Sequence, residues 1–171
     1  CINCIHILPD LKRLEREFAN ELVVIGVHSA KFENEGETEN IRQILQRYEI
    51  EHPVINDRDY RIWSAWGIRA WPTVMVVDPE GYVVGYLEGE GVYDVVRPVI
   101  ETLIMTFDAE GKIERDPITL TLATASRPET LLAFPGKVLA DEEGGRLFIA
   151  DSNHNRIVVA TLATYEVLAV I

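Results

Sequence analysis

Residues 1–18 read CINCIHILPDLKRLEREF and carry both cysteines of the chain, Cys1 and Cys4. Apolar side chains recur here at spacings of three and four between charged ones, which predicts an amphipathic helix: Ile5, Leu8, Leu11, Leu14 and Phe18. Pro9 removes one backbone hydrogen bond, so we expect a kink there and not an end, because the apolar stripe continues. The stretch therefore predicts one kinked helix that begins at a Cys-x-x-Cys pair.

A Cys-x-x-Cys pair at a helix amino terminus favours thiol chemistry. Cys1 would lie where free backbone N–H groups and the helix dipole stabilise a thiolate, so we expect its pKa below the free value of about 8.5. Cys4 follows one turn later on the same side, close enough to form a disulfide with Cys1 or to resolve a mixed disulfide. The pattern thus predicts Cys1 as the nucleophile and Cys4 as the resolving thiol.

The rest of the first 110 residues alternates helical and extended patterns. Leu22 to His28 is apolar on both faces and rich in β-branched residues, as in a strand buried in a parallel sheet. Thr38 is a plausible cap for a second helix that runs to Tyr48. The later patterns predict an extended piece at 53–57, a helix at 60–66, strands at 73–77 and 82–87, and a helix from Asp94 to Phe107.

The two strands at 73–77 and 82–87 are joined by Asp78-Pro79-Glu80-Gly81, a turn sequence that favours an antiparallel hairpin. Parallel β-α-β units need a strand before the first helix, and the chain begins at that helix. We therefore expect a central strand that ends just before Cys1, in a longer protein of which this chain is a fragment cut at both ends.

From Gly111 the sequence changes character. Residues 111–128 are interpreted as a linker, and four short strand-like runs follow at 136–141, 146–150, 156–160 and 166–171. Four strands in roughly 40 residues are typical of one propeller blade, whereas closed propellers need about 4–8 blades. The predicted domains are thus 1–110, an α/β domain, 111–128, the linker, and 129–171, the first blade.

Composition excludes several classes of function. The net charge of −12 repels phosphate backbones, so no nucleic-acid partner is expected. No apolar run approaches the roughly 18 residues that a membrane span requires. Two cysteines are too few for a disulfide scaffold or a four-thiolate zinc site. We expect no metal and no cofactor.

Other interpretations of single residues stay open. The cysteine pair could be half of a zinc site completed by histidines, but no two histidines have zinc-ligand spacing, or it could form an inert structural disulfide. His28 either has a role in the site or packs at a strand end. Trp63 and Trp66 are expected in the core, and Trp71 at the active surface.

Two polar clusters are interpreted as structural. Asp151, Asn153 and Asn155 are turn-forming residues whose side chains bond local backbone, with Arg156 pairing back to Asp151. The glutamates of residues 33–39 are expected in a solvated loop at the positive end of the next helix.

Cys1-Ile2-Asn3-Cys4, Pro9 and Trp71-Pro72-Thr73, in this order, resemble the thioredoxin-like fold over residues 1 to about 108. The stretch is most similar to the TlpA/ResA-like branch, whose inserted segment would be residues 30–48. The resemblance implies a cis bond before Pro72, beside the disulfide, and substrate binding at Trp71, Pro72 and Thr73. Thioredoxins commonly use a buried carboxylate to take the proton of the resolving thiol, and no residue of this chain is assigned that role.

The segments Phe134-Pro135-Gly136-Lys137-Val138 and 147–157 (LFIADSNHNRI) resemble an NHL repeat. The whole chain is similar to thioredoxin-domain-containing NHL-repeat proteins. This resemblance implies a thioredoxin-like fold without its first central strand followed by one NHL blade. It also implies that Ile118–Ala123 is an outer strand that closes the last blade onto the first.

The function we expect is thiol–disulfide oxidoreductase, with protein thiols or disulfides as substrates and the NHL propeller as a surface for protein partners. The alternative is a non-catalytic scaffold in which the propeller is the binding module. A peroxidase is disfavoured because no threonine-containing loop precedes a single reactive cysteine. The direction of electron flow is not determined, nor is the compartment, for which the cytoplasm is preferred over an extracytoplasmic location.

Overall fold

The computed structural model describes residues 1–116, 120, 122 and 130–171 of the chain. The chain forms two compact units, Cys1–Leu45 with Ile50–Ala125, and Gln46–Glu49 with Ser126–Ile171. We describe each unit by itself. The domain boundaries expected from the sequence stay predictions, and the outer strand expected at Ile118–Ala123 falls largely outside the described residues.

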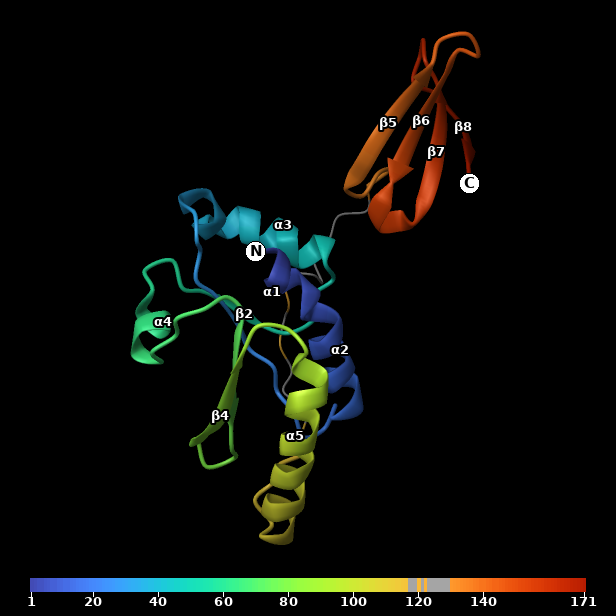
Figure 1. Cartoon of the computed structure of the whole chain (residues 1–171). Helices are drawn as coiled ribbons and strands as arrows, with labels where there is room; N and C mark the ends of the chain where they lie inside the picture. Colours follow the sequence, from blue (N-terminus) through green and yellow to red (C-terminus); the bar gives the residue numbers. More distant parts are fainter. Residues whose placement is uncertain (117–119, 121, 123–129) are drawn as a thin grey trace. The chain divides into compact units, whose positions relative to one another are not determined.

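Up to residue 110 the chain alternates helices and strands as the sequence predicts. The elements are α1 (Ile2–His6), α2 (Leu8–Glu17), β1 (Gly26–His28), the 3₁₀ helix η1 (Glu33–Gly36), α3 (Thr38–Arg47), β2 (Val54–Asn56), α4 (Arg61–Ala65), β3 (Thr73–Val77), β4 (Val83–Glu88) and α5 (Val92–Ala109) (Figure 1). This mixed order of helices and strands is the one expected from the resemblance to the thioredoxin-like fold.

The helix expected to be kinked at Pro9 is instead two consecutive helices. α1 ends at His6 and α2 begins at Leu8, with Pro9 in its first turn. Proline has no N–H to donate to the carbonyl four residues earlier and its ring crowds that carbonyl, so the first turn of a new helix accommodates it best.

The strand expected at Leu22–His28 is shorter in the structure. β1 covers Gly26–His28 and pairs with β2 in parallel, with Val27 opposite Ile55. Val23 and Ile25 lie before the strand and are 53% and 57% exposed. The N–H of Leu22 still donates to Phe18 O at 2.8 Å, so the chain is leaving α2 at this point.

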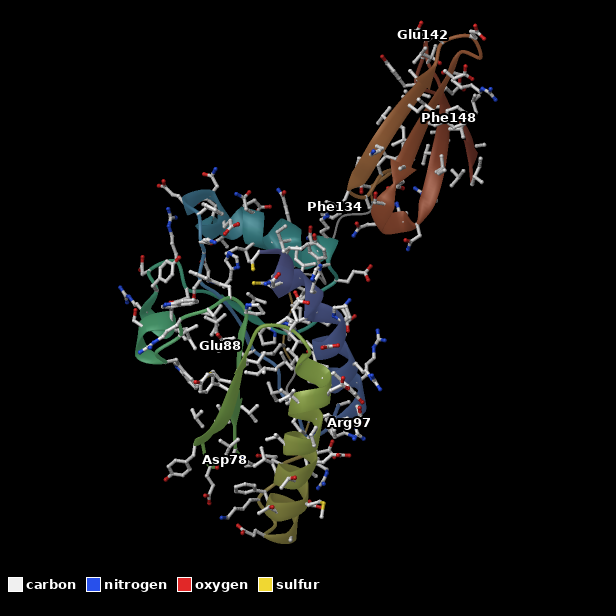
Figure 2. All side chains as sticks on the ribbon, viewed as in Figure 1. Asp78, Glu88, Arg97, Phe134, Glu142 and Phe148 are labelled. Carbon is white, nitrogen blue, oxygen red and sulfur yellow. The ribbon has the colours of Figure 1, made fainter. Side chains whose placement is uncertain are left out.

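The antiparallel hairpin expected from the turn sequence is confirmed. β3 pairs with β4, and Val74 lies opposite Leu87. Asp78 Oδ1 accepts the N–H groups of Glu80 and Tyr82, both at 2.9 Å, at the tip of the hairpin (Figure 2). Within the described residues, β1–β2 and β3–β4 are separate two-stranded sheets, and the central strand expected before Cys1 stays a prediction.

The core of this unit lies between α2, α5 and one face of the hairpin. Its buried members are Ile7, Leu14, Phe18, Val92, Tyr93, Val96 and Ile100, and Leu11, Leu22, Val74, Val76, Leu87 and Ile104 pack against them. The α2 and α5 residues recur at helical spacing, so each helix turns one apolar stripe inward. This packing fixes α2, the helix that continues from the cysteine-bearing α1.

Val96→Ala tests the core, and Val95→Ala is its matched control. Val96 is 5% exposed and Val95 is 51% exposed on the same helix. The two substitutions change helix propensity equally, so the difference isolates burial. We expect Val96→Ala to lower the free energy of unfolding by about 2 kcal/mol more than Val95→Ala. Equal losses in urea denaturation would contradict this core.

The second unit is an antiparallel sheet of four strands in sequence order, as predicted for a blade. They are β5 (Pro135–Asp141), β6 (Arg146–Asp151), β7 (Arg156–Thr161) and β8 (Val167–Val170), with the 3₁₀ helix η3 (Ser152–His154) between β6 and β7. The arrangement is compatible with a propeller blade.

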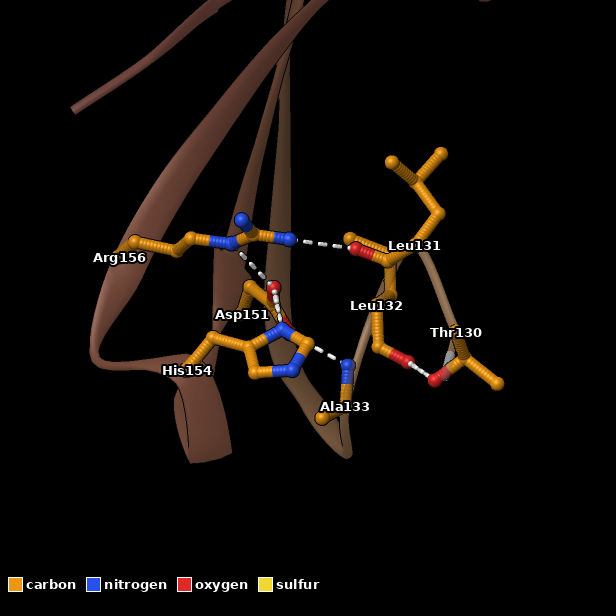
Figure 3. A network of polar contacts seen from close by, with 7 residues as sticks. All are labelled: Thr130, Leu131, Leu132, Ala133, Asp151, His154 and Arg156. Carbon is orange, nitrogen blue, oxygen red and sulfur yellow. Dashed lines mark hydrogen bonds and ion pairs between the residues drawn. The ribbon is translucent and has the colours of Figure 1, made fainter. Parts of the chain in front are cut away.

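Asp151, at the end of β6, is fully buried and ties this unit together (Figure 3). Its carboxylate accepts the N–H of Ala133 at 2.6 Å, and it lies 2.7 Å from His154 Nδ1 and 2.8 Å from Arg156 Nε. The pairing of Arg156 with Asp151 is therefore confirmed.

No helix in the described part of the chain is both long enough and apolar enough to cross a membrane.

Candidate active site

Cys1 is the N-cap residue of α1 and its side chain is exposed. Its carbonyl accepts the N–H of Ile5 at 3.3 Å, and its sulfur makes no capping hydrogen bond to the helix. Both Cys1 and Cys4 are free thiols in the structure. The nucleophile expected from the sequence thus lies at a helix start and is open to solvent.

Cys4 lies one turn further along α1 and is half-buried. Burial raises the pKa of the Cys4 thiol above its ordinary value, and the negative charge of Glu35 acts in the same direction. The two thiols therefore differ: Cys1 is exposed, whereas Cys4 is half-buried and its pKa is raised.

Glu35 belongs to η1, in the segment that the sequence analysis interpreted as a solvated loop. Its Oε2 accepts the N–H groups of Lys31 at 3.1 Å and Phe32 at 3.4 Å, and its carbonyl oxygen lies 3.0 Å from His28 Nε2. These bonds hold the carboxylate in a fixed turn. His28, at the end of β1, anchors that turn by its contact with the backbone.

Glu35→Gln is expected to lower the pKa of the Cys4 thiol. The substitution removes a negative charge that disfavours the thiolate and leaves the burial of Cys4 in place. The titration of Cys4, followed through its Cβ chemical shift by NMR, measures the change. Glu33→Gln, at an exposed position of the same 3₁₀ helix, is the control. An unchanged Cys4 titration in Glu35→Gln would contradict this electrostatic coupling.

Trp71, Pro72 and Thr73 lead into β3, and Trp71 reaches the cysteine pair. The Trp71–Pro72 peptide bond is cis, and Pro72 is buried. The Trp71 carbonyl oxygen lies 4.0 Å from Cys1 Sγ, within reach of the thiol as a donor. The Thr73 hydroxyl donates to the Ala70 carbonyl at 2.9 Å. The structure therefore brings the Trp71 carbonyl to Cys1, whereas the Thr73 hydroxyl is bonded to the backbone carbonyl of Ala70.

The indole of Trp71 is held on two sides. Its Nε1 donates to the Ser29 carbonyl at 2.9 Å, and its ring stacks on Trp63 with centroids 4.2 Å apart and planes 30° apart. Lys31 Nζ lies 5.9 Å from the ring centroid, in range for a cation–π contact.

The core position expected for Trp66 is wrong: this side chain is 44% exposed.

Asp57 is a buried carboxylate behind this pair of rings, and sequence reasoning missed it. It is 5% exposed and accepts three hydrogen bonds: Ser29 Oγ at 2.8 Å, Ile62 N at 3.0 Å and Trp63 N at 2.9 Å. Burial by itself raises the pKa of Asp57, but these hydrogen bonds outweigh it, so the pKa lies below its ordinary value. The sequence signal that could have found Asp57 is its position between a predicted strand and a short predicted helix, where an aspartate can bond the free N–H groups of the helix.

Each histidine considered for a zinc site contacts a neighbour in the structure. His6 lies 3.1 Å from Glu90, His28 contacts the Glu35 carbonyl, His52 lies 3.2 Å from Glu15, and His154 contacts Asp151. Within the described residues, no group of three or more His, Cys, Asp or Glu side chains could hold a metal ion.

Comparison with known proteins adds the family. Residues 1–83 match the family model of thioredoxin-like domains. The chain is 41% identical over 170 residues to NHL repeat-containing protein 2 of Gallus gallus, covering 98% of this chain and 23% of that protein. It is 42% identical over 158 residues to SUPPRESSOR OF QUENCHING 1, chloroplastic, of Arabidopsis thaliana, covering 90% of this chain and 15% of that protein.

A more distant relative is DipZ of Mycobacterium tuberculosis, which is 29% identical over 150 residues, 85% of this chain and 21% of that protein. The chain thus spans less than a quarter of the length of each of these relatives. It combines a thioredoxin-like domain with similarity to NHL-repeat proteins.

Proposed function

We propose, from the premise that residues 1–83 belong to the thioredoxin-like family, that the chain is a thiol–disulfide oxidoreductase with Cys1 and Cys4 as its redox couple. One observation carries the proposal. The exposed sulfur of Cys1 faces the Trp71 carbonyl at 4.0 Å, while its partner Cys4 is half-buried with a raised pKa. This asymmetry suits a pair in which one thiol attacks and the other resolves.

The reaction has two exchange steps. The Cys1 thiolate attacks one sulfur of a substrate disulfide, which forms a mixed disulfide and releases the first substrate thiolate. Cys4 then loses its proton and attacks Cys1 Sγ, which closes the Cys1–Cys4 disulfide and releases the second thiolate. Two electrons pass from the dithiol to the substrate, and the two cysteine protons end on the substrate thiols. Oxidation of a substrate dithiol is the reverse.

The segment Trp71, Pro72 and Thr73 is the proposed docking site for the substrate chain. A peptide lying alongside this segment would bring its disulfide to Cys1, because the Trp71 carbonyl already lies at the Cys1 sulfur. Lys31, near the Trp71 ring, would border the bound peptide.

Reduction of insulin disulfides, with dithiothreitol as the electron donor, tests the proposed function. We expect the purified protein to accelerate insulin precipitation, and we expect Cys1 to be alkylated by iodoacetamide at a pH below the ordinary range for a free thiol. An ordinary pKa for Cys1 together with no insulin reduction would overturn the proposal.

The second candidate function is a non-catalytic scaffold, and the similarity to NHL-repeat proteins favours it. In this case the four-stranded sheet would be part of a binding module for a protein partner, and the thioredoxin-like unit would be a platform. One measurement separates the two functions. A scaffold would bind its partner with unchanged affinity when both cysteines are replaced by serine.

A further inference from the structure

We propose that Asp57 is a positioning residue of the redox site, which acts through Ser29 and Trp63 to hold Trp71 at the Cys1 sulfur. The inference rests on the proposed function and deepens it. No step of the exchange reaction uses the buried carboxylate of Asp57. The inference gives it the role of holding the proposed docking segment in place.

The first path from Asp57 to Trp71 runs through Ser29. Asp57 Oδ2 accepts the Ser29 hydroxyl at 2.8 Å, and the Ser29 carbonyl accepts the Trp71 indole N–H at 2.9 Å. Ser29 is only 7% exposed, so water does not compete readily for its side chain. A single residue thus connects the buried carboxylate to the tryptophan beside Cys1.

The second path runs through α4. Asp57 accepts the N–H groups of Ile62 and Trp63, two of the free donors in the first turn of this five-residue helix. A helix this short is not stable by itself, so these bonds fix its position. They thereby set the ring of Trp63, which stacks on Trp71 at 4.2 Å.

Both paths end on the side chain of Trp71. The backbone carbonyl oxygen of the same residue lies 4.0 Å from Cys1 Sγ. The Cys1 thiol itself makes no contact with Asp57 among the interactions of the described residues. The effect of Asp57 should therefore fall on the docking surface and not on the nucleophile. Loss of Asp57 should weaken substrate binding more than it slows the chemical step.

Asp57→Asn is the test, and Asp59→Asn is its matched control. The amide nitrogen of asparagine cannot accept a hydrogen bond, so either the Ile62 bond to one carboxylate oxygen or the Ser29 and Trp63 bonds to the other are lost. Asp59 lies two residues away with 70% of its side chain exposed. We expect Asp57→Asn to raise KM for a disulfide peptide about tenfold with kcat within about twofold, and Asp59→Asn to change neither.

A second readout does not depend on activity. The indole N–H of Trp71, assigned by its disappearance in Trp71→Phe, should be protected from hydrogen exchange in the wild-type protein and in Asp59→Asn. It should exchange at least about tenfold faster in Asp57→Asn. Unchanged exchange and unchanged KM in a folded Asp57→Asn would overturn the positioning role.

Two further outcomes keep the proposals separate. If the wild-type protein reduces no disulfide, the proposed function fails, and indole exchange alone decides the role of Asp57. If Asp57→Asn does not fold, Ser29→Ala decides, because it removes only the hydroxyl bond and leaves the α4 bonds in place. Faster Trp71 exchange in Ser29→Ala supports the inference, and unchanged exchange overturns it.

Discussion

Cys1→Ser is expected to lower disulfide reduction to the uncatalysed rate, a loss of roughly 1,000-fold or more, because a serine hydroxyl does not form a mixed disulfide. Cys4→Ser is expected to lose turnover for another reason. Its Cys1 still attacks the substrate, but the half-buried resolving thiol is absent, so the mixed disulfide accumulates. The same substitution at two positions three residues apart thus gives two different products.

Non-reducing electrophoresis and mass spectrometry distinguish these products after incubation with a disulfide peptide. Cys4→Ser should gain the mass of one peptide half, and Cys1→Ser should gain none. A stable adduct on Cys1→Ser, at Cys4, would reverse the assigned roles. Adducts on neither variant, with an inactive wild-type protein, would favour the scaffold function.

Asp151→Asn is expected to destabilise the second unit strongly. Asp151 is fully buried and joins the segment before β5 to η3 and β7, through Ala133, His154 and Arg156. Removing the charge takes the counter-charge of Arg156 away from a fully buried position, and the amide nitrogen of asparagine then faces a hydrogen-bond donor. Hydrogen exchange of the β6 and β7 amides should become on the order of 100-fold faster.

Asp141→Asn is the matched control for this prediction. Asp141 also pairs with an arginine, Arg146, at 2.8 Å, but 30% of its side chain is exposed, so water can replace the lost contact. We expect a much smaller change in amide exchange. Equal effects of the two substitutions would show that burial of Asp151 is not what stabilises the sheet.

The buried carboxylate of Asp151 also makes the stability of the second unit sensitive to acid. Burial by itself raises the pKa of Asp151, but the bonds from Ala133, Arg156 and His154 outweigh it and lower the pKa to about 2, from an ordinary value of 3.8. A carboxyl group with a lowered native pKa stabilises the fold above its unfolded pKa, and this stabilisation is lost as the pH falls toward the native value. Stability should therefore fall between pH 3.8 and about 2, and less steeply in Asp151→Asn.

Much of the local structure could be predicted from the sequence. The hairpin at β3 and β4, the helix α5 and the four strands of the second unit follow from apolar periodicity and turn residues close in sequence. The errors were also local. A new helix begins at Leu8, with Pro9 in its first turn, where a kink was expected, and β1 covers three residues where a seven-residue strand was expected. Both errors concern where an element begins, which depends on neighbouring segments.

The candidate site was predicted only in part. Cys1, Cys4, Trp71, Pro72 and Thr73 were named from motifs, and their roles stay predictions. Asp57 and Glu35 were missed, because a single aspartate after a strand or a glutamate among glutamates has no distinctive pattern. Trp66 was assigned to the core by helical spacing, yet it is exposed.

The sequence by itself determined which residues are candidates for thiol exchange, Cys1 and Cys4, and where most helices and strands lie, since spacing along the chain governs both. Only the tertiary structure decided that the Ser29 carbonyl holds the Trp71 indole and that the Glu35 charge acts on Cys4. These pairs are separated by tens of residues along the chain. Their proximity follows from how the helices and strands pack, and no local pattern encodes that packing.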